Sequence, residues 1–311
     1  MIDLKVKAYY KTNLGAAYLG DSLKLMKKIP DSSIDLILTS PPFALTRQKE
    51  YGNKQEQEYV EWFLKFSKEF YRILSDKGSL VIDLGGAYIP GFPVRSIYQY
   101  ELLVKLCREQ NFFLAQEFYH YNPSRLPTPA EWVTVRRIRV KDSVNVVWWL
   151  SKSEFPKATN RNVLKPYSDS MKSLIKNGYK AKLRPSGHNI SDKFGKDNGG
   201  AIPPNLLELA NTNSNGQYQK KCRENRIKPH PARFPSGFSD FFIKFLTDET
   251  DIVLDPFAGS NTTGFSAETL NRKWISIELN EQYLEGSQYH FESDLNLTIN
   301  KKLNGIKTSK V

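Results

Sequence analysis

The stretch VLDPFAGSNTTG, residues 253–264, decides the fold of this chain of 311 residues. An apolar strand ends at Asp255, a tight turn follows, and Gly259 and Gly264 flank a short polar segment that opens a helix. Glycine lets a backbone approach a ligand closely. The residues of the segment that can cap the helix N-terminus are Ser260, Asn261 and Thr262.

A second acidic residue follows at the spacing of a Rossmann-like unit. Glu278 ends the next apolar run, WISIE, at 278 − 255 = 23 residues after Asp255, where a carboxylate can accept hydrogen bonds from ribose hydroxyls. The glycine spacing is not the G-x-G-x-x-G of dinucleotide sites, and no G-K-[ST] of a phosphate loop follows. An acid and a proline at the start of the loop would repel a pyrophosphate and favour a cofactor with cationic sulfonium and ammonium groups. A plain strand-to-helix turn is the alternative.

Apolar runs of strand length alternate with helical patterns at both ends of the chain. The expected strands are Ile34–Thr39 and residues 79–84, 112–119, 144–150, 251–255 and 274–278. The expected helices include residues 59–74 and 262–272, whose apolar positions follow helical spacing. This alternation predicts an α/β fold with a mostly parallel sheet and helices on both of its faces.

The sequence TSPPF follows the first of these strands. Consecutive prolines make a rigid turn at the carboxyl edge of the sheet, where ligands bind in open parallel sheets. There Ser40 offers a hydroxyl, Pro41 a carbonyl and Phe43 a flat apolar face, and Pro42 completes the turn. Two acceptors and a stacking surface suit a planar base with an exocyclic amino group, because acceptors on both hydrogens aim the nitrogen lone pair at an incoming methyl group. A purely structural turn is the alternative.

The charge is concentrated in the middle of the chain. Residues 151–235 hold 17 Lys and Arg against 6 Asp and Glu, which is 17 − 6 = +11 of the total +12. Such a block indicates a polyanionic partner, although a solvated lysine-rich surface would have the same composition. Cys107 and Cys222 form no C-x-x-C or Cys/His cluster, so we expect no metal, no disulfide and a reducing cytoplasm. No apolar run is long enough to span a membrane.

Together these motifs resemble the amino-group DNA methyltransferases, in the order where the catalytic motif precedes the cofactor loop. The likeness covers most of the chain: GDSL, TSPPFAL, DLGGAY, EWV, RRIRVKD, VWW, PHPARFP and DPFAGSNTTG. It is strongest to the PvuII-type cytosine-N4 modification methylases, in which Ser before Pro-Pro goes with cytosine rather than adenine. The resemblance implies a Rossmann-like, circularly ordered methyltransferase fold with S-adenosyl-L-methionine as cofactor. It divides the chain into a catalytic half (1–150), an irregular target-recognition insert (151–228) and a cofactor half (229–311).

The resemblance also assigns roles to residues. Ser40, Pro41, Pro42 and Phe43 match the catalytic motif, and Asp83, at the end of the neighbouring strand, is expected to orient Ser40 or polarise the target amine. An exposed carboxylate is the alternative for Asp83. The residues expected to bind the cofactor are Asp21, Phe234, Pro235, Asp255, Phe257, Gly259, Ser260, Asn261, Thr262 and Glu278. His230 begins the HPARFP element that contains Phe234 and Pro235, with an exposed loop histidine as its alternative.

Double-stranded DNA is the expected partner, and its target base must be flipped out of the helix to reach a concave site. The proline-stiffened segment 122–132 is expected to wall the base pocket. The residues expected to contact DNA are Arg125, Arg136, Arg137, Arg139 and Lys141 near the cleft, and Arg184 and His188 in the insert. The resemblance suggests CAGCTG as target sequence and a cognate restriction endonuclease acting on the same site without direct contact, in a bacterial-type cytoplasm.

Three other functions stay open at this point. Adenine-N6 methylation uses a similar site, and only Ser40 argues against it. A methyltransferase for RNA or a small amine is a second possibility, although the basic insert disfavours a small substrate. The third is a DNA-binding regulator that keeps the fold and has lost turnover.

Overall fold

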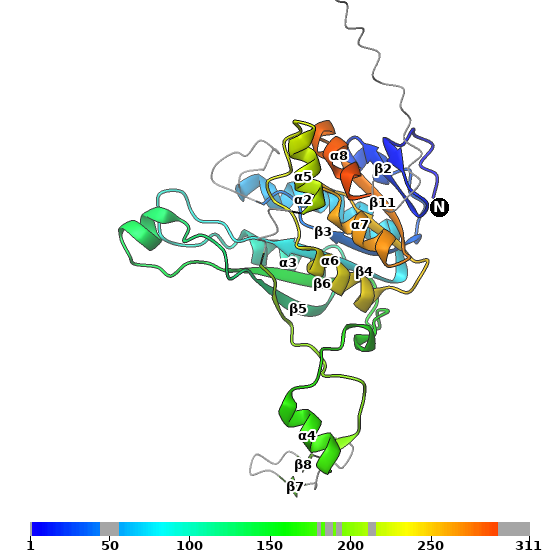
Figure 1. Cartoon of the computed structure of the whole chain (residues 1–311). Helices are drawn as coiled ribbons and strands as arrows, with labels where there is room; N and C mark the ends of the chain where they lie inside the picture. Colours follow the sequence, from blue (N-terminus) through cyan, green and yellow to red (C-terminus); the bar gives the residue numbers. More distant parts are fainter. Residues whose placement is uncertain are drawn as a thin grey trace, which may run out of the picture.

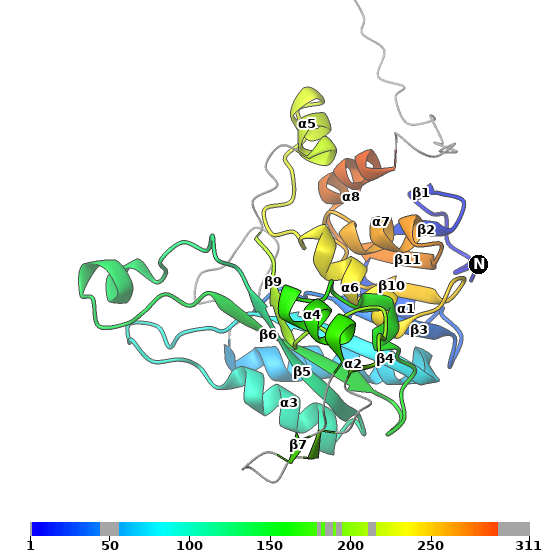
Figure 2. The ribbon, with the colours of Figure 1, turned by 60° about the horizontal axis from the view of Figure 1, so that its bottom comes forward.

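The computed structural model describes residues 2–43, 56–178, 182–183, 189–190, 195–210 and 216–291. Its centre is a nine-stranded sheet of order β1-β2-β11-β10-β3-β4-β6-β5-β9 with helices on both faces (Figures 1 and 2). The strands are β1 (Tyr10–Lys11), β2 (Gly15–Leu19), β3 (Ile34–Thr39), β4 (Leu74–Leu84), β5 (Phe113–Tyr121), β6 (Val144–Ser151), β9 (Leu206–Glu208), β10 (Ile252–Asp255) and β11 (Lys273–Glu278). A separate hairpin pairs β7 (Lys182–Leu183) with β8 (Asn189–Ile190).

The sheet is parallel from β2 to β4 and mixed beyond β4. Neighbouring pairs within β2, β11, β10, β3 and β4 all run parallel, whereas β6 runs antiparallel to both β4 and β5. The α-helices are α1 (Ser22–Met26), α2 (Glu56–Ile73), α3 (Tyr98–Arg108), α4 (Asp169–Asn177), α5 (Gln217–Glu224), α6 (Ser236–Leu246), α7 (Thr262–Thr269) and α8 (Glu281–Ser287). The expected α/β class and parallel core are confirmed.

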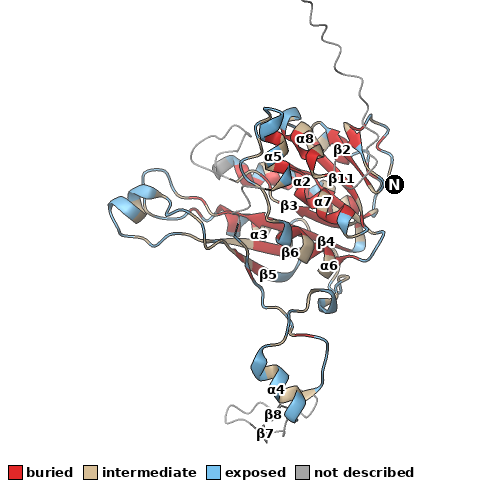
Figure 3. Ribbon diagram, viewed as in Figure 1, coloured by how far each residue is buried: buried red, intermediate tan, exposed pale blue. Residues whose placement is uncertain are grey.

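Alternate residues of each central strand enter two different hydrophobic cores. In β3, Ile37 packs in one cluster with Phe63 and Phe70 of α2. Its neighbour Leu36 packs in the other cluster with Phe242 of α6. Because successive strand side chains point to opposite faces, both faces need a helical cover. Figure 3 shows the resulting buried sheet inside more exposed helices and loops.

The strands of the central sheet agree closely with expectation, whereas the middle segment of the chain does not. β3 has the expected bounds, while β4 begins at Leu74, five residues before the expected 79. The insert is less irregular than expected, because it contains α4, the β7–β8 hairpin and β9. β9 pairs with β5 and so belongs to the main sheet. The three-part division of the chain at 150 and 228 stays a prediction.

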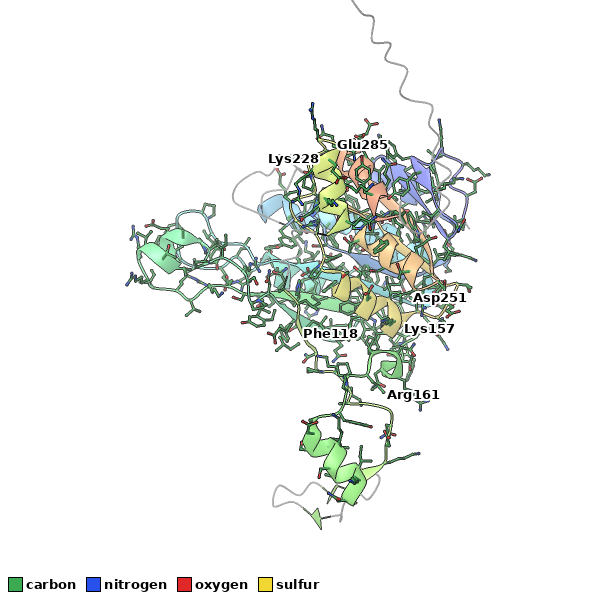
Figure 4. All side chains as sticks on the ribbon, viewed as in Figure 1. Phe118, Lys157, Arg161, Lys228, Asp251 and Glu285 are labelled. Atoms are coloured by element: carbon green, nitrogen blue, oxygen red, sulfur yellow. The ribbon has the colours of Figure 1, made fainter. Side chains whose placement is uncertain are left out.

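Two segments extend away from this core. Residues 122–143 form an arm between β5 and β6, and it contains a π-helical turn, Glu131–Val135. In Figure 1 the arm projects to the left, and α4 with the β7–β8 hairpin hangs below the sheet. Lys157, at the start of the insert, forms a 2.6 Å ion pair with Asp251 before β10 (Figure 4). In the part of the chain that the structure describes, no helix is both long and apolar enough to cross a bilayer.

The strand order changes direction between β3 and β10, which places a crevice at their carboxyl ends. From β3 the chain continues through α2 to β4 on one side, and from β10 it continues through α7 to β11 on the other. Such a switch point is where open α/β sheets bind ligands. A buried hydrogen bond spans it: Thr39 Oγ1 donates to Asp255 Oδ1 at 2.8 Å. The two motifs of the sequence therefore meet at one place.

We expect Thr39→Val to lower the free energy of unfolding by about 1–3 kcal/mol, because a buried carboxylate oxygen loses a donor. Thr269→Val is the matched control: Thr269 is the exposed last residue of the otherwise mostly buried α7, and its hydroxyl donates to the Phe265 carbonyl. The cost of this substitution should stay within about 0.5 kcal/mol. Urea unfolding of the three proteins measures both values. Equal stability of the Thr39 variant and the parent protein would contradict a role for this bond.

Candidate active site

A cavity of about 490 Å³ opens at the switch point, a size that suits a small-molecule site. Both ends of the chain contribute to its wall: the turn after β3 on one side, and the loops after β10 and β11 on the other. The expected site residues that line it are Asp21, Ser40, Pro41, Pro42, Phe43, Asp83, Arg125, Phe234, Asp255, Phe257, Gly259, Ser260, Thr262 and Glu278. The structure thus brings most of the candidate residues into one place.

Asp255 is buried and already has hydrogen-bond donors from the protein itself. Oδ1 accepts from Thr39 Oγ1 at 2.8 Å and from the Phe257 amide at 3.1 Å, and Oδ2 accepts from Thr263 Oγ1 at 2.8 Å. Burial raises the pKa of Asp255 to about 6, against these hydrogen bonds, which favour the charged form. The carboxylate therefore fixes the shape of the loop, and direct contact with a cofactor stays a prediction.

Glu278 closes the loop from the neighbouring strand. Its Oε2 accepts from the Gly259 amide at 2.7 Å and its Oε1 from the Asn280 amide at 2.8 Å. Burial raises the pKa of Glu278. Each carboxylate oxygen has a second lone pair, so Glu278 can still accept a ligand hydroxyl in the cavity. The position matches the expected ribose-binding acid.

Two features of the backbone at Gly259 favour glycine. Its φ is +51°, and a Cβ at this position would lie 3.1 Å from the His230 ring. The His230 ring also packs 4.4 Å from the Tyr283 ring, and burial lowers the pKa of His230 to about 4. His230 thus lines the cavity and is not the exposed loop histidine of the alternative interpretation.

Two expected cofactor residues do not line the cavity. Asn261, with a left-handed φ of 55°, caps α7 through the Gly264 amide and donates to the Tyr10 hydroxyl at 2.8 Å beneath the loop. Pro235 is the residue before α6 and is followed by the helix that packs on the sheet. Neither residue is part of the cavity lining, and the Asn261 side chain is instead used to cap α7.

The turn after β3 presents its side chains toward the cavity. Ser40 and Phe43 are half-buried there. A Cβ at Gly85, just after β4, would clash with the Phe43 ring. Gly85 of DLGG therefore makes room for this ring, while Gly86 makes room for the Arg95 guanidinium, and the sequence pattern alone did not reveal either packing role. Phe43 has one face against Gly85, which holds the ring in place beside Ser40.

Asp83 near the end of β4 is buried, with only 4% of its surface exposed, so the solvent-facing alternative is wrong. Its Oδ2 lies 3.6 Å from Nδ1 of His120 on β5. This is ion-pair distance and too long for a hydrogen bond. Asp83 Oδ1 and His120 Nδ1 are both buried without a hydrogen-bond partner in the described structure.

Several cavity residues were missed by the sequence analysis. They are Trp62 and Phe66 on α2, His120 and Asn145 on β5 and β6, and Leu279 and Tyr283 after β11. Asn122 also lines the cavity, and it lies in the segment 122–132 that was expected to wall the base pocket. Trp62 and Phe66 fit the helical pattern of α2 and look like ordinary core residues; Phe66 reaches the site by packing 5.0 Å from Phe257. His120 lies in FYHY within a strand, where alternation alone does not say which face contains a site.

The basic residues of the arm that are expected to contact DNA lie in different environments. Arg125 Nη1 donates to Asn145 Oδ1 at 2.7 Å beside the cavity. Arg136 pairs with Glu131 at 2.7 Å. Among the described residues, the exposed Arg137 has no hydrogen bond or ion pair.

Arg139 and Lys141 stabilise the arm itself. Arg139 Nη1 donates to the Pro93 carbonyl at 2.5 Å, and Lys141 Nζ donates to the carbonyls of Pro123 and Arg125 at 3.2 Å. Arg184 and His188, the expected base contacts of the insert, lie outside the described residues.

The fold and the site are those of a Rossmann-like transferase. Its S-P-P-F turn faces a cavity whose wall includes the carboxylates of Asp255 and Glu278. A DNA methylase family, that of the N6- and N4-methyltransferases, matches residues 34–289. This match covers more than half of the chain, so the protein belongs to this family of DNA methylases.

Individual relatives agree with the family match. The type II methyltransferase M.PvuII of Proteus hauseri is 51% identical over 98% of this chain and 94% of its own length. The solved structure of the PvuII DNA methyltransferase, described as cytosine-N4-specific, has a TM-score of 0.76 and 47% identity over 92% of this chain and 89% of the other. A structure of M1.HpyAVI with SAM has a TM-score of 0.52 and 19% identity over 89% and 98%, which shows the shared fold.

The raised pKa of Asp255 predicts a pH-dependent stability. Between the ordinary value of 3.8 and about 6, the folded state holds a proton that the unfolded state has released. Stability therefore falls as the pH rises through this window. The difference of about 2 between these two pKa values corresponds to about 3 kcal/mol in the free energy of unfolding.

Asp255→Asn removes this ionisation, so its free energy of unfolding should fall less between pH 4 and pH 7 than that of the parent protein. Urea unfolding at several pH values measures both curves, and their difference isolates Asp255 from other groups such as Glu278. Parallel curves would show that Asp255 does not bind a proton more tightly in the folded state.

Proposed function

We propose that this protein transfers a methyl group from S-adenosyl-L-methionine to the exocyclic N4 of cytosine in double-stranded DNA. The observation that carries the proposal is that Ser40 and the loops of Asp255 and Glu278 line the same cavity. Membership of the DNA methylase family and the cytosine-N4-specific relative support the same reaction.

The cavity residues fit the cofactor chemically. Glu278 and Asp21 place carboxylates on the wall, where they can accept from ribose hydroxyls and from an adenine amino group. Phe257 and Leu279 supply apolar surface, and the positive φ of Gly259 brings backbone close to the ligand. When bound, S-adenosyl-L-methionine supplies an electrophilic methyl group on a sulfonium.

The protein's own groups hold and activate the amine. Ser40 Oγ and the Pro41 carbonyl accept the two amino hydrogens, and the Phe43 ring stacks on the base. Accepting both hydrogens draws the nitrogen lone pair out of conjugation and aims it at the methyl group, so the catalysis is by position and electrostatics. N4 then gives up one hydrogen as a proton, and the Asp83 carboxylate on the same wall is a base that can take it.

Ser40 is the residue on which the preference for cytosine over adenine depends. Both bases present an amino group beside a ring nitrogen, so the same turn could hold either one. A cytosine-N4-specific relative with 47% identity favours cytosine. CAGCTG as recognition sequence, a cognate endonuclease acting on the same site and a cytoplasmic location complete the proposal.

DNA is proposed to lie along the arm, with the target base flipped into the cavity. Arg125 reaches the cavity wall, and Arg136 and Arg137 at the tip of the arm are placed to contact phosphates. Arg184 and His188 in the basic insert are proposed base contacts. Phosphate contacts fix the register of the duplex, while base contacts supply specificity.

Ser40→Ala should lower the rate of methyl transfer at least about 100-fold, because the amine loses an acceptor that matters in the transition state. Cofactor affinity should stay near that of the parent protein, whereas Asp255→Ala should lose both transfer and cofactor binding. Tritium transfer to duplex DNA and calorimetry with S-adenosyl-L-methionine give the two readouts. Ser33→Ala, at the opposite end of β3, is the control, and an unchanged rate in Ser40→Ala would refute the proposed pocket.

Arg137→Gln should weaken binding to all duplex sequences alike, because a phosphate contact carries no sequence information. The slope of log K against log salt should become shallower by about 1. Lys273→Gln, at the amino end of β11 and away from the cavity, should leave the slope unchanged. Titration of labelled duplexes at several salt concentrations tests this, and equal slopes for Arg137→Gln and the parent protein would exclude a phosphate contact.

A further inference from the structure

His120 and Asp83 form a buried polar pair on the cavity wall. The proposed reaction gives a role to Asp83 and none to His120. The side chains are 9% and 5% exposed, and they meet across β6, the strand between β5 and β4. Asp83 Oδ1 and His120 Nδ1 are buried without a hydrogen-bond partner in the described structure. Leaving such atoms unpaired is costly, so the pair calls for an explanation.

The surroundings of the His120 ring fix its hydrogen positions. Nε2 lies 3.3 Å from the Leu209 carbonyl oxygen, which can only accept, so Nε2 carries a hydrogen. Leu209 is itself held in place because its amide donates to the Tyr121 carbonyl at 3.0 Å. The Phe238 ring packs 5.3 Å from the imidazole and limits its rotation.

The other ring nitrogen faces the carboxylate of Asp83. If His120 carried its hydrogen on Nε2 alone, Nδ1 would present a lone pair to a carboxylate oxygen, and the two would repel. The arrangement is favourable only when one further hydrogen lies between Nδ1 and the Asp83 carboxylate. The 3.6 Å separation then needs to shorten by less than 1 Å to make a hydrogen bond, and catalytic hydrogen bonds commonly tighten by such an amount when the substrate binds.

We propose that His120 is a positioning residue that holds the Asp83 carboxylate for the target amine. One carboxylate oxygen pairs with Nδ1 of His120, and the other turns to the base in the cavity as an acceptor. The role rests on the proposed function, because it assigns His120 to the same reaction. It also links the insert to the chemistry: Leu209 follows β9, so the end of the insert's strand sets the orientation of His120.

Two near-isosteric variants separate the two ring nitrogens. An asparagine amide can occupy the position of Nδ1, and a glutamine amide that of Nε2. His120→Gln should therefore lower kcat about 10- to 100-fold, the usual cost of removing a group that orients a functional side chain. The KM for DNA and the cofactor affinity should stay within about threefold of the parent protein, because the groups that bind both are intact.

His120→Asn should recover most of the lost kcat, because it restores a donor to Asp83. Adding Asp83→Asn to His120→Gln should cost no more than Asp83→Asn alone, since His120 acts through Asp83. An unchanged kcat in His120→Gln, a His120→Asn variant no better than His120→Gln, or fully additive losses would each overturn the inference. Thermal unfolding of each variant checks that the fold is retained.

A measurement on the unaltered protein covers the case in which His120 variants do not fold. The chain has only four histidines, so the ring-nitrogen resonances of ¹⁵N-histidine-labelled protein can be assigned. Nδ1 of His120 should show a bound or strongly hydrogen-bonded hydrogen, and a bare Nδ1 would overturn the inference. This readout needs no turnover: failure of the parent protein to methylate DNA would refute the proposed function, whereas a bare Nδ1 in an active enzyme would refute only the role of His120.

Discussion

The hydrogen bond from Thr39 to Asp255 is the contact on which the rest of the site depends. It joins the last residues of β3 and β10, the two strands between which the sheet changes direction. The residues after Thr39 form the turn that we propose to be catalytic, and those after Asp255 form the loop that we propose to bind the cofactor. Since a buried carboxylate needs its donors, the bond fixes the distance between the two loops, and the proposed reaction requires that distance to be fixed.

The cavity is built at a cost in stability. Burial raises the pKa of both Asp255 and Glu278, so each carboxylate disfavours its charged form in the folded protein. Both are stabilised by backbone amides, which hold the loop in one shape before any ligand arrives. Asp83 differs, because one of its oxygens has no partner in the described structure. A group left in this state is a natural acceptor for a substrate hydrogen.

Some basic residues of the arm and the insert contact the protein itself, and others are exposed. Arg139 and Lys141 stabilise the arm through backbone carbonyls, whereas Arg137 stays exposed at its tip. The insert in turn is tied to the core by Lys157 and by β9. Because β9 sits beside β5, the segment proposed to read DNA also contacts the strand that holds His120. The residues proposed for recognition and those proposed for chemistry therefore share one sheet.

The sequence by itself determined the α/β class, the bounds of β3 and the two motifs of the site, because hydrophobic periodicity and the special backbone needs of SPPF and DPFAGS are local properties. It also identified the reaction through family resemblance. Only the tertiary structure decided that β9 joins the sheet, that Asn261 and Pro235 do not line the cavity, and that His120 meets Asp83. These depend on pairings between segments far apart in the chain, such as β4 and β5 on either side of β6, and no local pattern encodes which distant strands become neighbours.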